Sequence, residues 1–234
     1  PTVDNEVRGN YIGTNAAGDV DSAITSVQGE GVRIAGDSSD NIVTGNRIAG
    51  NRDSGVGVRS LTITQFSATA TPGNNAILGN EIYSNIPGGT INDGEGSGID
   101  IYTATVASLG FPADILADSY TERGNTVNDP TDVDTGPNGF MNTPIINTAT
   151  QNGAELTVNF DLYAADSPVD QYRVEFFAND TADYGSGKAY LGAITSANGN
   201  SQNESFTLPA SYNTQGKYIS ATTTALNAST NSGF

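Results

Sequence analysis

The sequence predicts an all-β protein in two parts: a short right-handed parallel β-helix, followed by an antiparallel β-sandwich. First, short runs with apolar residues at alternate positions recur along the chain, which is typical of strands with one buried face. Second, the N-terminal half contains an Asn- and Gly-rich repeat. Third, the C-terminal part alternates strand patterns with turn residues. No segment shows a convincing helical period, and the 28 glycines oppose helix formation.

The repeat in the N-terminal half has the consensus Asn-x-x-x-Gly-Asn-x-Ile-x-x-Asn. It occurs without gaps at residues 5–15, 41–51 and 75–85, and a shortened form follows at 123–127. A second pattern, glycine followed by a strand with two alternate aliphatic residues, lies at 31–34, 55–58 and 98–101. Each repeat therefore contains several short strands joined by turns, as a β-helix requires and a βαβ unit does not.

Stacking explains the choice of residues in these strands. One repeat cannot bury its apolar side chains alone, whereas stacked repeats align them in continuous inward rows. The two expected rows are Val32, Val56, Ile99 and Ile12, Ile48, Ile82.

The repeated asparagines are expected at the corners of the stack. Asparagine tolerates the left-handed backbone conformation, and its side-chain amide can hydrogen-bond to the same residue in the next repeat. The expected ladder residues are Asn10, Asn46, Asn80, Asn15, Asn51 and Asn85.

The chain divides into residues 1–128 with the repeats, an acidic Gly- and Pro-containing linker at 129–142, and a sandwich at 143–234. In the last part, six strand patterns are separated by turns such as Asn152-Gly153 and Asn198-Gly199. They lie at 143–148, 155–163, 171–178, 189–195, 203–208 and 217–226.

Residues 1–128, with their three Asn-x-x-x-Gly-Asn-x-Ile copies, resemble the parallel β-helix repeat proteins of bacterial surfaces and secretions. The resemblance implies a fold and exposure to glycans, and it does not imply a particular reaction. The stretch 129–142, the following TPIIN and the later YRVEFFAND resemble immunoglobulin- or fibronectin-like modules that follow β-helix repeats in large bacterial surface proteins.

Composition excludes several classes of function. With 9 basic and 26 acidic residues, the net charge of −17 argues against binding to nucleic acids and to anionic membranes. The absence of Cys and His excludes disulfide scaffolds, thiolate or histidine metal sites and His-dependent catalytic triads. No run approaches the roughly 20 apolar residues of a membrane span.

The composition also bears on location. Absence of Cys with abundant Asn, Thr, Ser and Gly favours an extracellular or bacterial cell-surface location.

The linker is the expected metal site. Asp129, Asp132, Asp134 and Asn138 crowd one turn-rich segment, where alternate oxygen ligands suit calcium. The segment departs from an EF-hand, since Gly136 occupies the fifth position and Thr143 the twelfth. The alternative is a solvated acidic linker. Calcium would stiffen the connection between the two parts.

A second polar group is expected on one outward face of the β-helix. Its members are Asp93, Glu95, Asp100, Arg33 and Arg59. A glycosidase needs two carboxylates about 5–10 Å apart, but no outward row carries acids in successive repeats. No catalytic residue is therefore assigned.

The preferred prediction is a non-catalytic extracellular or surface module for adhesion, matrix or fibre architecture. Its expected partners are polysaccharides, other surface proteins or further copies joined through the open β-helix end. The alternative is a carbohydrate-active β-helix enzyme, such as a polysaccharide lyase or glycoside hydrolase, or a glycan-binding module derived from one.

Overall fold

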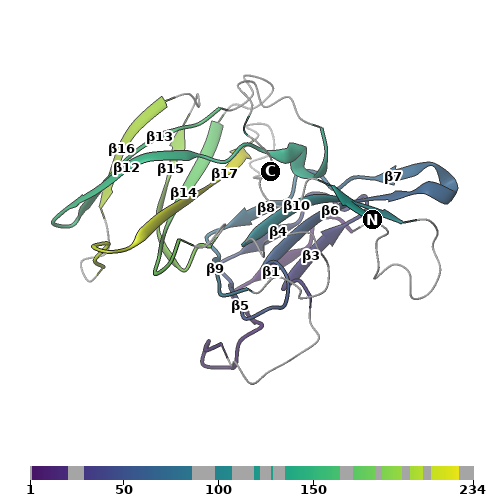
Figure 1. The fold of residues 1–234 in the computed structure, drawn as a ribbon, viewed down its shortest axis with the longest axis horizontal. Helices are drawn as coiled ribbons and strands as arrows, with labels where there is room; N and C mark the ends of the chain where they lie inside the picture. The colour runs from purple at the N-terminus through teal and green to yellow at the C-terminus, as the bar shows by residue number, and fades with distance from the viewer. Residues whose placement is uncertain are drawn as a thin grey trace.

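The structure is a computed structural model that describes residues 2–20, 29–85, 98–106, 119–121, 128, 135–163, 171–182, 186–196, 201–207 and 212–226. Nearly all regular structure in these residues is β, with two short 3₁₀ helices, η1 (Thr64–Phe66) and η2 (Pro137–Phe140), and no α-helix. Figure 1 shows parallel strands in one part and antiparallel strands in the other, lying against each other. Among the described residues, no helix could cross a bilayer.

Three parallel sheets build the N-terminal part. One contains β1 (Glu6–Arg8), β4 (Ile42–Thr44) and β8 (Ala76–Leu78), and another contains β2 (Tyr11–Ile12), β5 (Arg47–Ala49) and β9 (Glu81–Tyr83). The third contains β3 (Val32–Ala35), β6 (Val56–Ile63) and β10 (Ile99–Val106), to which β7 (Ala68–Ala70) and β11 (Ser119–Thr121) add antiparallel edges. The chain visits the three sheets in turn, so each pass adds one strand to each sheet. We call β1–β3 the first layer, β4–β6 the second, and β8–β10 the third.

The predicted alignment of apolar rows is confirmed. Val32 pairs with Val56 and Val56 with Ile99, while Ile12 pairs with Ile48 and Ile48 with Ile82. These side chains and their neighbours form one core, in which the members of the second layer are the most deeply buried. Burying one such aliphatic side chain contributes about 1.5–3 kcal/mol, so stacking stabilises strands that are only two to eight residues long.

Two three-stranded antiparallel sheets form the C-terminal part. One orders β12 (Ile145–Asn152), β13 (Glu155–Asp161) and β16 (Ser201–Thr207), and the other orders β15 (Ala189–Ser196), β14 (Gln171–Asn179) and β17 (Tyr218–Leu226). Alternate residues of β13 and β14 point into one shared core, where the rings of Phe160 and Phe176 meet edge to face at 5.6 Å. The six strand patterns predicted from the sequence correspond to these six strands.

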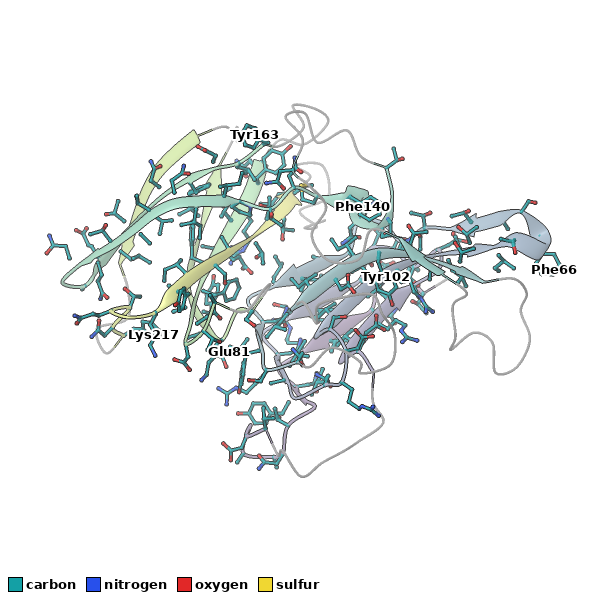
Figure 2. The ribbon with its side chains drawn as sticks, viewed as in Figure 1. Phe66, Glu81, Tyr102, Phe140, Tyr163 and Lys217 are labelled. Carbon is teal, nitrogen blue, oxygen red and sulfur yellow. The ribbon has the colours of Figure 1, made fainter. Side chains whose placement is uncertain are left out.

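Part of the expected linker packs onto the parallel sheets. The short helix η2 contacts β6 and β10, and Phe140 within it is 4% exposed. Figure 2 shows Phe140 at the parallel part, on the same side as Tyr102 of β10. Residues 137–140 therefore cover the parallel part instead of forming a free connection.

Candidate functional site

The repeated asparagines form hydrogen-bonded ladders along the parallel part. Asn10 donates its backbone N–H and its Nδ2 to Oδ1 of Asn46, and Asn46 donates in the same way to Asn80, over 2.9–3.2 Å. Asn51 repeats this arrangement with Asn85. Each amide thus satisfies a backbone donor at a corner that apolar residues could not satisfy.

Asn15 differs from the expectation that it would continue the ladder to Asn51. Its Oδ1 accepts hydrogen bonds from the backbone N–H groups of Ala17 and Asp19, so it caps its own turn. The buried Oδ1 of Asn51 has no hydrogen-bond partner. Gly13 approaches this oxygen closely without offering a side-chain donor, because a Cβ there would lie 2.5 Å from Asn51 Oδ1.

A third ladder, which the sequence analysis did not predict, contains Asn5, Asn41, Asn75 and Asn138. The first three are the first Asn of the consensus in each repeat, and they donate in order along the stack. Asn138 continues the series: its Oδ1 accepts from the backbone N–H and the Nδ2 of Asn75, both at 3.2 Å, and its Nδ2 donates to the Asn75 carbonyl at 2.8 Å.

This position conflicts with the prediction that Asn138 is a calcium ligand. Two hydrogen bonds already occupy the lone pairs of its Oδ1, and metal binding would break the ladder. The other expected ligands, Asp129, Asp132 and Asp134, lie outside the described residues. Within the described part of the chain, no three acidic side chains gather into a group that could hold a metal.

The expected ligand face is the outer surface of the sheet β3–β6–β10. Arg33, Gly57 and Asp100 form one row, and Ala35, Arg59 and Tyr102 form the next. Asp93 and Glu95 lie outside the described residues. Asp100 is 1% exposed and Arg59 7%, so at these two residues the face is buried and closed to a polymer.

Glu30, which the sequence analysis did not single out, organises this face. It pairs with Arg33 and accepts a hydrogen bond of 2.7 Å from the Tyr102 hydroxyl. Gly57 makes room for it, because a Cβ there would lie 1.9 Å from Glu30 Oε1. Burial opposes the charge on Arg33, but attraction to Glu30 and the hydrogen bond between them outweigh it and raise the Arg33 pKa.

The two parts of the molecule meet through direct hydrogen bonds. Ile82 of β9 and Gly187 exchange both backbone hydrogen bonds, at 2.8 and 2.6 Å, in an antiparallel bridge. The backbone N–H of Gly79 donates to Glu175 Oε2 at 2.7 Å, and Arg173 pairs with the other carboxylate oxygen. Glu175 is 1% exposed, so both contacts lie inside the junction.

An open groove of about 870 Å³ runs along this junction. Both lysines of the chain, Lys188 and Lys217, line it and each lies 2.5 Å from the carboxylate of Asp180. These hydrogen bonds and charges lower the pKa of Asp180 to about 2. Lys188 also lies over the ring of Tyr83, at 5.6 Å from its centroid.

The parallel part supplies the opposite wall of the groove. There Arg47 and Glu81 form an ion pair at 2.8 Å across neighbouring layers. Figure 2 shows Glu81 and Lys217, one from each part, on the same side of the junction. Three basic and three acidic side chains line the groove, so it lacks the strong negative charge of the chain as a whole.

No protein-family model matches the sequence, and a search of curated proteins finds none that is significantly similar.

Proposed function

We propose that this chain is a non-catalytic structural and adhesive module of an extracellular or bacterial cell-surface protein. In this proposal the parallel part is a short right-handed β-helix of the repeat type, and the antiparallel part is an immunoglobulin- or fibronectin-like sandwich. The observation that carries the proposal is the junction, where backbone pairing and a buried carboxylate connect the two parts. Such a junction suits a stiff spacer that holds a binding surface in a fixed orientation.

The arrangement of the acids supports a non-catalytic role. Glu30 is committed to Arg33 and Tyr102, and a carboxylate held in this way is poorly placed to exchange a proton with a substrate. Asp100 is buried on the same face. These contacts give the charged residues of this sheet a structural role, so a catalytic role is not needed to account for them.

A polysaccharide panel tests this proposal. The protein is incubated with neutral and acidic polysaccharides, and reducing ends and unsaturated uronate absorbance are followed. We expect neither product above the level given by heat-denatured protein. Release of either product, and its loss in Glu30→Gln or Asp100→Asn, would establish the enzymatic alternative instead.

Glycan binding in the junction groove is the second candidate function. Ligand sites favour clefts between structural units, and the groove has the volume of a short oligosaccharide. The ion pair Arg47–Glu81 offers donors and acceptors for sugar hydroxyls, and Tyr83 and Tyr212 supply ring surfaces. Because the groove is close to neutral, a neutral glycan fits it better than a charged one.

A glycan array with two matched variants tests this candidate. Arg47→Gln removes a groove donor, whereas Arg8→Gln removes an exposed arginine of β1 away from the groove. We expect Arg47→Gln alone to weaken binding of neutral glycans. Equal binding by both variants would place any glycan site elsewhere.

Calcium binding by Asp129, Asp132 and Asp134 stays a prediction. The melting temperature of the protein, compared in chelator and in excess calcium, tests it directly. Because Asn138 belongs to a ladder, we expect Asn138→Ala to lower the melting temperature by the same amount in both buffers. A loss confined to the calcium buffer would restore Asn138 as a ligand.

A further inference from the structure

A second open groove, of about 720 Å³, adjoins the junction groove on the antiparallel part. Its walls come from residues 149–151 of β12 and from the loop 212–217 that precedes β17. Three residues, Tyr212, Asn213 and Lys217, line both grooves. The two grooves are therefore contiguous, and a ligand that passes Tyr212 can lie in both.

Gln151 of β12 holds the wall of the second groove in place. Its Oε1 accepts two hydrogen bonds of 2.7 Å, from the backbone N–H and from the hydroxyl of Thr214. Its Nε2 donates to the carbonyl oxygens of Tyr212 and Gly153, at 3.2 and 3.0 Å. These four hydrogen bonds tie the loop 212–217 to β12, so the groove is formed before a ligand arrives and less conformational entropy is lost on binding.

Tyr212 stands where the two grooves meet. Its side chain is half-buried and packs against the core of the antiparallel part. A tyrosine ring that is fixed by packing and still lines a groove offers a sugar an apolar surface, and little side-chain entropy is lost when the sugar stacks on it.

The polar groups of the second groove suit a ligand without charge. Among its described lining residues there is no acid, and its one base, Lys217, pairs with Asp180 at 2.5 Å. The other side chains there are amides, hydroxyls and the single aliphatic residue Ala149. Peptide recognition takes its specificity from pockets for alternate side chains, which this lining does not offer. A chain rich in hydroxyl groups therefore matches the groove better than a peptide does.

We propose that the two grooves form one continuous track for an unbranched neutral polysaccharide, with Tyr212 as its central stacking residue. The polysaccharide runs from Arg47 and Glu81 of the parallel part, across Tyr212, to Thr150 of β12. Each groove alone has the volume of a small ligand, so only a longer segment of a polymer uses both. The inference rests on the glycan binding proposed above for the junction groove, and it specifies the length and charge of the glycan.

A length series of oligosaccharides tests the track. Cello-, manno- and xylo-oligosaccharides of about two to eight units are titrated into the protein in a calorimeter. We expect the dissociation constant of the bound series to fall at least about tenfold once the oligosaccharide spans both grooves, because the second contact is then intramolecular. A dissociation constant that does not change with length would overturn the track and leave a glycan site in the junction groove. Absence of binding by all three series would overturn the glycan proposal itself.

Variants on either side of Tyr212 locate the track. Thr150→Arg fills the second groove from an exposed position of β12, so it should weaken long oligosaccharides to the level of short ones and leave the short ones unchanged. Tyr212→Ala should weaken the long oligosaccharides, whereas Tyr212→Phe keeps the ring and should bind them as the wild type does. Tyr218→Ala, which removes an exposed tyrosine outside both grooves, is the matched control.

The exposed position of Thr150 keeps the test decisive if Tyr212→Ala does not fold. Equal effects of Thr150→Arg on short and long oligosaccharides would contradict a track through the second groove. Equal losses in Tyr212→Phe and Tyr212→Ala would contradict stacking on the ring. Displacement of the longest oligosaccharide by an equal concentration of a random peptide mixture would assign the track to a polypeptide instead.

Discussion

Replacing Asn46 by alanine tests how much the asparagine ladders stabilise the parallel part. The Asn46 side chain is 2% exposed and makes four hydrogen bonds. Its Oδ1 accepts two from Asn10, and its Nδ2 donates to the Val7 carbonyl at 2.8 Å and to Asn80 Oδ1 at 2.9 Å. Alanine removes all four and leaves the backbone of the strand in place.

The expected loss follows from these four bonds. At about 0.5–1.5 kcal/mol net for each, they sum to about 2–6 kcal/mol. The lower half of that range applies, because Asn80 Oδ1 keeps the hydrogen bond from the Asn46 backbone and Asn10 can turn to water. Asn10→Ala is the matched control: this exposed side chain makes only two hydrogen bonds, so we expect a loss below about 1 kcal/mol.

Urea unfolding followed by far-ultraviolet circular dichroism measures both variants. We expect a lower midpoint for Asn46→Ala with an unchanged slope, since the surface exposed on unfolding stays the same. The reasoning would be refuted if the losses of unfolding free energy in the two variants differed by less than about 0.5 kcal/mol. Interior and terminal rungs of the ladder would then stabilise the protein equally.

Three further predictions concern the charged contacts. Glu175→Ala should lower the unfolding free energy by about 3 kcal/mol, because it removes two hydrogen bonds to a buried carboxylate, from Gly79 and Arg173, each worth at least about 1.5 kcal/mol. The exposed Glu155→Ala in β13 should change the unfolding free energy little, and equal losses in urea titration would contradict this. Gly57→Ala should lower the melting temperature, because the new Cβ would displace the Glu30 carboxylate; an unchanged melting temperature would show that the outer face can rearrange. The pKa of Asp180 is about 2 in the folded protein, below the ordinary value of about 3.9. Its ion pairs therefore stabilise the protein fully above about pH 3.9, and this stabilisation is lost as the pH falls through about 2. The melting temperatures of wild type and Asp180→Asn should therefore converge over that interval, and a constant difference would exclude this titration.

The strands and their register in the parallel part could be predicted because the repeat fixes both. Alternation of aliphatic residues marks the buried face, and the ungapped consensus fixes which residues align, as for Ile12, Ile48 and Ile82. The same alignment already contained the ladder of Asn5, Asn41 and Asn75. The Gly-Asn pairs, on which the expected ladders rest, do not include these three asparagines, so the pairs alone do not predict this ladder.

Contacts between the two parts could not be predicted in the same way. Glu175 lies on the face of β14 opposite the sandwich core, and a charged residue there is expected to meet solvent. In the fold it is buried where the two parts meet, and its carboxylate accepts a hydrogen bond from the Gly79 backbone. Phe177, buried on the same face, was a usable indication, since two adjacent phenylalanines give one strand two apolar faces. Asn138 lies outside the repeat, so no periodicity indicated that it continues a ladder.

The covered third layer has a consequence for the order in which the chain folds. Rungs between layers join residues 34 or 36 positions apart, whereas Asn138 reaches Asn75 across 63 positions and Glu175 reaches Gly79 across 96. Loop closure makes the last contact only about 0.9 kcal/mol more costly than the first, so the delay is set by synthesis. At about 5–20 residues per second, strands β8 and β9 wait on the order of 5–20 s for their cover. During that time β8 and β9 can pair with other nascent chains. The C-terminal sheets prevent such pairing only after they have been synthesised and have packed against the third layer.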